Sequence, residues 1–166
     1  MAYLTDNDRE AGGCPFCVAH KVARELPGLI VRAADLAYVT LNLYPYNNGH
    51  LLILPYRHVA DLTDLSPNEA SALMAELTGA QRALQAALSP VGFNIGMNLG
   101  EAAGAGIPGH VHFHIVPRWS GDTNFMPVVA DTKVMPETLE QTKQRLLAVW
   151  GTQDTPEAGD RDGSTR

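Results

Sequence analysis

The chain has 166 residues, of which 45% are hydrophobic and 18% are charged, and its formal net charge is −6. This length favours one domain that buries a core of its own. The chain lacks the apolar run of about 18 residues that a transmembrane helix requires, and its negative charge argues against a nucleic-acid polymer bound through phosphates. We therefore expect neither a membrane nor a nucleic-acid partner, although local donors can still bind a small anion.

The N-terminal residues 1–13 are polar and end in glycine, which predicts a flexible arm. This start has no apolar stretch of the kind found in secretion signals, so we expect a cytoplasmic protein. The only two cysteines, Cys14 and Cys17, are then expected to serve metal binding or redox chemistry instead of a structural disulfide. Spacing alone leaves three interpretations open: half of a tetrahedral zinc site, a redox pair, or two buried thiols.

Short apolar segments bounded by turn formers predict the first strands. Two of them cover residues 29–32 and 36–41. Residues 42–49 are rich in Asn, Pro and Tyr and end in Gly, so they are expected to form a loop. The apolar segment 50–54 follows and ends at Pro55, which predicts a buried strand.

A long helix is predicted to begin after Ser66. Ser66 suits the N-cap, Pro67 suits the first helical position, and Glu69 completes a capping box. Apolar residues then recur at helical spacing until Pro90 and Gly92 end the pattern; they are Ala70, Leu73, Leu77, Ala80, Leu84 and Leu88.

After this helix, residues 93–98 alternate like a strand, and the glycine-rich segment 100–109 leads into a cluster of histidines. A last helix is expected over 136–150. Residues 151–166 carry almost no apolar side chains and are expected to be a disordered tail. The domain should therefore cover 14–150. Several strands with one long helix and a C-terminal helix predict an α+β fold with an antiparallel sheet.

Three histidines, His110, His112 and His114, alternate along one segment with the apolar residues Val111, Phe113 and Ile115. Successive side chains of a strand point to opposite faces, so the imidazoles should share one face while the apolar side chains pack on a core. Imidazole can attack phosphorus, exchange protons or bind a metal near neutral pH. A central nucleophile flanked by two orienting or proton-donating imidazoles would suit attack on a phosphate, and all three are candidate catalytic residues.

The glycine-rich segment before the histidines could supply phosphate donors. Glycine lets backbone N–H groups approach an anion closely, which makes the backbone of Gly104, Ala105 and Gly106 a candidate phosphate site. Asn98, on the preceding strand, could add its side-chain amide. The alternative is that these glycines only form a tight connection.

The segment His-Val-His-Phe-His-Ile-Val at 110–116 resembles the signature of the histidine triad (HIT) family. Supporting matches lie at Gly49–Pro55, Arg57-His58, Asn98–Gly100 and Ala103-Gly104, and the resemblance covers residues 14–150. It implies a five-stranded antiparallel sheet in each subunit and a homodimer in which the sheets pair into ten strands. It also implies a nucleotide hydrolase or transferase acting on a nucleotide or dinucleoside polyphosphate.

The resemblance assigns a role to each candidate residue. His112 becomes the nucleophile that is nucleotidylated, and His114 contacts the phosphate and assists the leaving group. Asn98 binds the α-phosphate, Asn42 holds the ribose hydroxyls, and His50 supports the triad. Weaker candidates for the nucleobase pocket are Leu29, Val39, Leu41 and Leu43, each of which could equally be ordinary core.

Two features set this chain apart from the family pattern. Many members carry Gly-Gln-Ser or Gly-Gln-Thr before the triad, whereas this chain has Gly-Ala-Gly at 104–106, so backbone amides must do more of the phosphate binding. The extension 117–125 resembles the branch that contains diadenosine tetraphosphate phosphorylases, which pass the nucleotidyl group to phosphate instead of water.

The resemblance also completes a zinc site. A zinc-bearing subset of the family, and the related galactose-1-phosphate uridylyltransferases, combine such a cysteine pair with a histidine after the buried strand and the first triad histidine. The implied ligands are Cys14, Cys17, His58 and His110, and the implied zinc is structural, with closed coordination.

Two other functions compete with the nucleotidyl-transfer hypothesis. All three triad histidines could bind one metal, although alternate residues of a strand spread them over about 13 Å, which is awkward for a single small ion. The protein could also bind nucleotides as a regulator without useful turnover.

Overall fold

The computed structural model describes residues 13–22, 28–123, 125–130, 132 and 134–153. The arm expected at 1–13 lies outside these residues except for Gly13. The expected tail lies outside them from residue 154 onward. The last helix has the predicted length but lies three residues later: α5 covers Leu139–Gln153, so residues 151–153 of the expected tail are helical.

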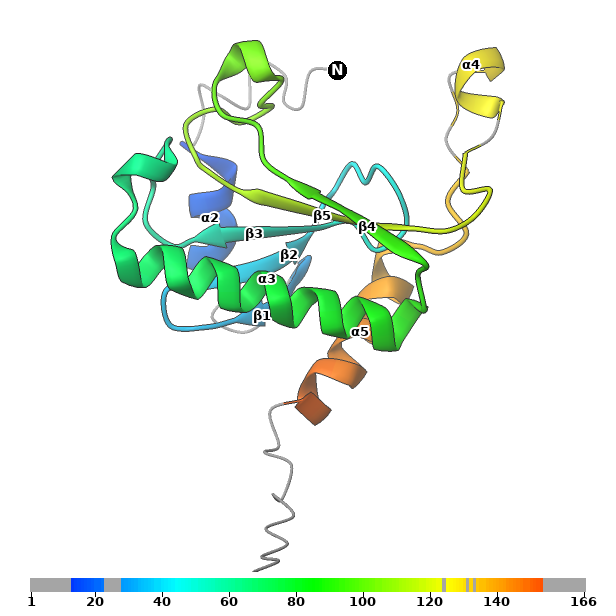
Figure 1. Ribbon diagram of the computed structural model, residues 1–166, viewed down its shortest axis with the longest axis horizontal. Helices are drawn as coiled ribbons and strands as arrows, with labels where there is room; N and C mark the ends of the chain where they lie inside the picture. The colour runs from blue at the N-terminus through cyan, green and yellow to red at the C-terminus, as the bar shows by residue number, and fades with distance from the viewer. Residues whose placement is uncertain (1–12, 23–27, 124, 131, 133, 154–166) are drawn as a thin grey trace, which may run out of the picture.

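One sheet of five antiparallel strands organises the described chain (Figure 1), as expected. The strands lie in the order β1-β2-β3-β5-β4, so β5 is inserted between β3 and β4. This insertion matters because it sets the histidine strand at the centre of the sheet, beside β3. The bounds are β1 (Ile30–Ala33), β2 (Ala37–Leu41), β3 (Leu51–Pro55), β4 (Gly92–Gly96) and β5 (Phe113–Arg118).

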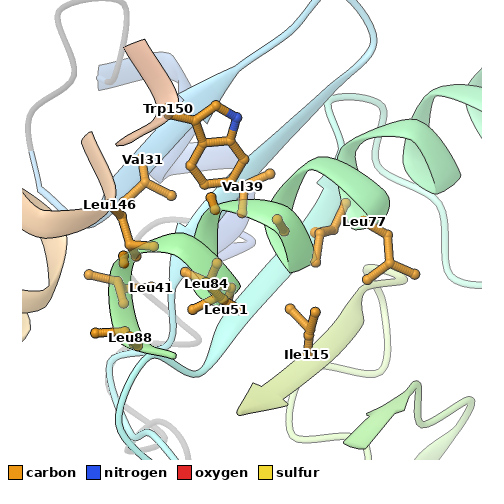
Figure 2. Close-up of a cluster of buried hydrophobic side chains, with 14 of the residues drawn as sticks. Val31, Val39, Leu41, Leu51, Leu77, Leu84, Leu88, Ile115, Leu146 and Trp150 are labelled. Carbon is orange, nitrogen blue, oxygen red and sulfur yellow. The ribbon is translucent and has the colours of Figure 1, made fainter. Parts of the chain in front are cut away.

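Two helices, α3 (Pro67–Leu88) and α5, cover one face of the sheet and bury the main core against it (Figures 1 and 2). Leucines 73, 77, 84 and 88 form the apolar stripe of α3, as the spacing predicts. The sheet contributes alternate residues from its central strands, and α5 contributes Leu146 and Trp150. Each such side chain stabilises the fold by about 1.5–3 kcal/mol.

The opposite face carries α2 (Pro15–Val22), a short helix that the sequence analysis did not anticipate. Figure 1 shows α3 in front of the sheet and α2 behind it. Phe16 of α2 packs on a second, smaller apolar cluster formed by Ile30, Tyr38, Leu52 and Leu54. The two layers therefore have different roles: one face is sealed by long helices, and the other is only partly covered.

The capping box of α3 is present as predicted, and it also ties the helix to the loop after β3. Ser66 Oγ accepts from the Glu69 amide, and the Glu69 carboxylate accepts from the Ser66 amide. The same carboxylate accepts two bonds from the Arg57 guanidinium, at 2.8 and 2.7 Å. The Arg57 side chain, then the Ser66 donors, lower the pKa of Glu69 to about 2. This contact fixes the segment next to His58.

The described residues also include three short helices: η2 (Leu62–Asp64), η3 (Glu101–Ala103) and α4 (Met126–Ala130). α4 stands away from the body of the molecule (Figure 1). None of the helices in the described part of the chain is both long and apolar enough to cross a membrane.

The histidine strand begins later than predicted. β5 starts at Phe113, so His110 and His112 precede it. Although β3 continues to Pro55, its pairing with β5 stops at Ile53 with Phe113, and the Val111 N–H bonds instead to Val59 O at 2.7 Å. The faces are nevertheless as expected, since Phe113 and Ile115 belong to the helix-side core.

Gly49 occupies a position that no other residue can take without strain. Its φ is +73°, and a Cβ there would lie 2.5 Å from Leu88 Cδ1 and 3.0 Å from Leu84 Cδ2. The glycine thus lets the loop before β3 pass closely over the end of α3.

Replacing Gly49 with alanine should destabilise the protein by about 2–5 kcal/mol, which combines the cost of a left-handed conformation with that of overpacking. Gly121→Ala is the matched control, because Gly121 has a φ of +74° but open space around its Cβ position. It should cost only about 1–2 kcal/mol. Urea denaturation measures both, and equal losses would contradict the close approach to α3.

Candidate active site and candidate metal centre

A cavity of about 430 Å³ opens on the α2 side of the sheet. The side chains of His112 and His114 lie in its wall, next to a mostly apolar lining. Backbone from the glycine-rich segment closes one side of it. Its lining includes Pro15, Phe16, Leu29, Ile30, Leu41, Asn42, Leu43, Tyr44, Tyr46, Asn98, Gly104, Gly106 and Ile107. A cavity with apolar walls and a few converging polar groups is the usual form of a small-molecule site.

The ring of His112 is held in one tautomer by its own strand. Its Nδ1 lies 2.8 Å from the backbone carbonyl oxygen of His110. A carbonyl oxygen can only accept, so Nδ1 carries the hydrogen and donates it. The unprotonated Nε2 is then available as a nucleophile.

A chain of hydrogen bonds orients His114 and places its hydrogen on Nε2, the opposite tautomer to that of His112. The Tyr46 amide donates to His50 Nδ1 at 3.0 Å, so His50 must carry its hydrogen on Nε2. His50 Nε2 lies 2.9 Å from His114 Nδ1 and donates to it. His114 Nδ1 is therefore an acceptor, and its hydrogen is on Nε2. The neutral pair thus offers one lone pair from His112 and one N–H donor from His114.

The support beneath His114 is buried and well satisfied. His50 is fully buried, and Asn42 Nδ2 donates to its Nδ1 at 3.2 Å. The Tyr46 ring stacks on the His114 ring with centroids 5.7 Å apart. Asn47 holds this loop by donating to Pro117 O and to Asp122 Oδ2. These contacts hold His114 in one orientation.

Burial keeps both pocket histidines neutral. It lowers the pKa of His112, although the bond to the His110 carbonyl acts in the other direction. Burial, and then the nearby His112, lower the pKa of His114 to about 4. Because a protonated imidazole is no nucleophile, this environment maintains the reactive form of His112 at neutral pH.

The four residues expected to bind metal come together beside this cavity. Cys14, Cys17, His58 and His110 present ligand atoms that all lie within 4.8 Å of one another. The Sγ–Nδ1 distances are 3.5 Å for Cys14 with His110, 3.4 Å for Cys17 with His58, and 3.6 Å for Cys17 with His110. Zinc with tetrahedral bonds to sulfur and nitrogen would set these atoms about 3.6 Å apart. The donor set and its spacing therefore fit zinc.

His110 is prepared for metal binding by its second nitrogen. Its Nε2 lies 3.0 Å from the Pro55 carbonyl oxygen, which can only accept, so Nδ1 is unprotonated and faces the thiols. The ring is fully buried and does not line the cavity. Both nitrogens are thus committed, which makes His110 a ligand candidate and not an acid or base in the pocket.

Helix α2 places both cysteines. Cys14 accepts the first helical bond, from the Val18 amide at 3.1 Å, and Pro15 takes the first helical position. Cys17 follows within the same first turn.

The remaining expected residues fall in two groups. The lining of the cavity includes Asn42, Asn98, Gly104 and Gly106. Ala105 lies on the other side of the loop and lines a separate hollow beside His58. Of the nucleobase candidates, Leu29, Leu41 and Leu43 contribute to the lining of the cavity. The side chains of Val39 and Leu41 nevertheless both belong to the helix-side core, because alternate residues of β2 share that face.

The sequence analysis missed three aromatic residues of the site. Phe16 lies between His110 and His112, with ring centroids 5.6 and 5.1 Å away. Tyr38 donates its hydroxyl hydrogen to Phe16 O at 3.0 Å, and burial raises its pKa far above the usual value, so it remains a donor. Tyr46 stacks on His114. A proline directly after Cys14 was the one local signal for the helix that carries Phe16.

The chain matches known proteins over most of its length. The HIT domain family model matches residues 23–121. The chain is 45% identical over 139 residues to the AP-4-A phosphorylase of Mycobacterium tuberculosis, covering 84% of this chain and 71% of that protein. It is 32% identical over 125 residues to the asymmetrical bis(5'-nucleosyl)-tetraphosphatase of Schizosaccharomyces pombe, covering 75% and 65%.

Solved structures share this fold. A Zn-bound histidine triad family protein from Mycobacterium smegmatis superposes with a TM-score of 0.69 at 29% identity, covering 87% of this chain and 98% of that chain. A hypothetical histidine triad nucleotide-binding protein from Sulfolobus tokodaii gives a TM-score of 0.70 at 23% identity, covering 91% and 100%. The second likeness concerns the fold alone.

The hydrogen bonds predict a specific set of imidazole tautomers in the neutral protein. His112 should carry its hydrogen on Nδ1, whereas His50, His110 and His114 should carry theirs on Nε2. Long-range ¹⁵N–¹H NMR correlations of the imidazole rings at pH 8 distinguish the two forms. A His112 ring with its hydrogen on Nε2 would contradict the assigned nucleophile.

Proposed function

The chain belongs to the HIT domain family, and we propose that it transfers a nucleotidyl group from a dinucleoside polyphosphate through a covalent intermediate on His112. The observation that carries this proposal is the 2.8 Å bond from His112 Nδ1 to the His110 carbonyl. It leaves Nε2 unprotonated in a cavity whose apolar walls suit a nucleobase.

In the first step, the Nε2 lone pair of His112 attacks the α-phosphorus, and a new N–P bond forms. The bond from phosphorus to the bridging oxygen of the leaving nucleotide breaks at the same time. The N–H on His114 Nε2 donates a hydrogen bond to that leaving oxygen and stabilises the negative charge that develops on it. Nδ1 of His112 keeps its hydrogen, so the His110 carbonyl stabilises the positive charge that develops on the ring.

In the second step, an acceptor oxygen attacks the same phosphorus and the N–P bond breaks, which restores His112. We assign inorganic phosphate as the acceptor, on the 45% identity to an AP-4-A phosphorylase. A diadenosine tetraphosphate would then yield ATP in the first step and ADP in the second. Water as the acceptor would yield AMP instead of ADP, as the 32% identity to a tetraphosphatase would favour.

Residues of the cavity wall have corresponding binding roles. Asn42 donates to His50 and accepts from the Tyr44 amide through Oδ1, and the second lone pair of Oδ1 can accept from a ribose hydroxyl. Asn98 and the backbone of Gly104 and Gly106 would bind the α-phosphate. The apolar side chains of Leu29 and Leu43 would contact the base.

We also propose that Cys14, Cys17, His58 and His110 bind one structural zinc ion. Ligand spacing near the tetrahedral value and the tautomer of His110 support this. Zinc would supply a cross-link between α2 and the segment before β5, with no open coordination position. A cytoplasmic location, where thiols remain reduced, suits this site.

A homodimer is the proposed assembly. β4 is at the edge of the sheet, and its Ile95 is 46% exposed. An unpaired apolar edge favours association with a second copy, which would extend the sheet to ten strands. Sedimentation equilibrium should give twice the chain mass, and a monomer at micromolar concentration would contradict this assembly.

Substituting His112 with asparagine should abolish turnover of diadenosine tetraphosphate, with a loss of at least about 10³-fold, because no lone pair remains to form the N–P bond. The wild type, quenched during a single turnover of α-³²P-labelled substrate, should carry acid-labile label on His112. Assays with and without phosphate identify the acceptor by product. Nucleotide binding without label or turnover would favour a regulator.

Metal analysis separates the nucleophile from a ligand role. His112→Asn should retain one zinc per chain, whereas Cys17→Ser should lose most of its zinc, because Cys17 belongs to the ligand cluster and His112 does not. Loss of zinc from His112→Asn would instead support a metal held by the triad.

A further inference from the structure

Helix α2 belongs to both sites at once. It carries Cys17 of the metal cluster, and Cys14 directly precedes it; Pro15 and Phe16, between the two cysteines, form part of the cavity wall. Ala19, one turn later, lines the same cavity. The other two ligand residues, His58 and His110, lie outside α2. A metal at this cluster would therefore fasten one wall of the cavity to the rest of the domain.

Phe16 is the side chain that touches both sites directly. Its ring meets the ring of His110 nearly edge-on, with centroids 5.6 Å apart and planes at 88°. It meets His112 at 5.1 Å and 60°. Edge-on aromatic contacts have a preferred geometry, so a shift of Phe16 alters the packing of both histidine rings. Phe16 thus lies between a metal ligand and the proposed nucleophile.

The backbone of Phe16 has a separate attachment to the sheet. The buried hydroxyl of Tyr38 on β2 donates to Phe16 O at 3.0 Å. Tyr38 itself stacks on Tyr56 with centroids 5.4 Å apart. α2 is therefore held by the sheet, through this bond and the packing of Phe16 on the smaller apolar cluster, and also by the cysteine cluster, which is the part that depends on a ligand.

We infer that Phe16 couples the metal cluster to the nucleotide pocket, so that zinc and a nucleoside monophosphate each bind more tightly when the other is present. Without metal, the first turn of α2 loses its attachment to His58 and His110, and Phe16 can move away from His112. A nucleotide packed against Phe16 holds the same turn in place and keeps the thiols at ligand distance. Linkage requires the two effects to be equal. Phe16 acts here as a positioning residue.

This inference rests on the proposed nucleotide site, and one experiment tests both. The zinc affinity of the zinc-loaded protein is measured by competition with a chelator, with and without saturating AMP. AMP binding to the same protein is measured by calorimetry. We expect AMP to tighten zinc at least about fivefold, and removal of zinc to weaken AMP by the same factor.

Phe16→Leu keeps all four ligands and an apolar wall but removes the edge-on contacts, so the coupling should fall below about twofold. Phe125→Leu is the matched control: Phe125 is 69% exposed beside α4, and its replacement should leave the coupling at the wild-type value. Tyr38→Phe, which removes only the hydroxyl group, should also weaken the coupling. It serves as the test if circular dichroism shows that Phe16→Leu does not fold.

Each result decides between the two proposals. AMP that binds equally well with and without zinc overturns the coupling and leaves the proposed function intact. A zinc-loaded protein that does not bind AMP overturns both. Undiminished coupling in the folded Phe16→Leu variant overturns the role of Phe16.

Discussion

The hydrogen bond from His112 Nδ1 to the carbonyl oxygen of His110 is the constraint on which the site depends. It joins a side chain to the backbone two residues earlier, so the extended chain itself fixes the tautomer of the central histidine. The residue that supplies the carbonyl is also the one whose ring faces Cys14 and Cys17 and whose Nε2 donates to Pro55. The position of the candidate metal cluster and the orientation of the proposed nucleophile are therefore not independent. A displacement of His110 would alter both.

The two faces of the sheet have different roles: one buries most of the core, and the other holds the polar groups of the candidate site. α3 and α5 bury the larger core on one face, which leaves the other face free to hold polar groups. His50 and Asn42 are buried there at 0% and 3% exposure, a costly position for polar side chains that lack partners. They bond to each other, to the Tyr44 and Tyr46 amides and to His114, so their polar atoms are satisfied. These hydrogen bonds offset the free-energy cost of burying the polar groups. The same bonds also set the direction of the His114 donor.

The sequence predicts what depends on neighbours along the chain. The capping box at Ser66 and Glu69, the apolar stripe of α3 and the alternation around His112 and His114 are local patterns, and the structure contains all three. The predicted start of β5 was wrong because it depends on contacts distant in sequence: the pairing with β3 stops at Phe113, and Val111 bonds to Val59 instead. α2 was missed because it is short and lacks a polar cap. Its position comes from contacts such as Tyr38 with Phe16, which no periodicity reveals.

The same limit explains which features of the site the sequence alone does not predict. His50 and His114 are 64 residues apart and Cys14 and His110 are 96 apart, so their pairing followed from family resemblance and not from spacing. Ring tautomers depend on which acceptor each nitrogen meets, and only the fold determines that. Among the described residues, the lining of the cavity contains no lysine, arginine, aspartate or glutamate. A phosphate would thus meet neutral donors in the resting site, and a positive charge would appear on His112 only as its bond to phosphorus forms. In the proposed mechanism, such a site would form its strongest electrostatic interaction in the transition state and not with the bound substrate, which is the condition for accelerating the chemical step.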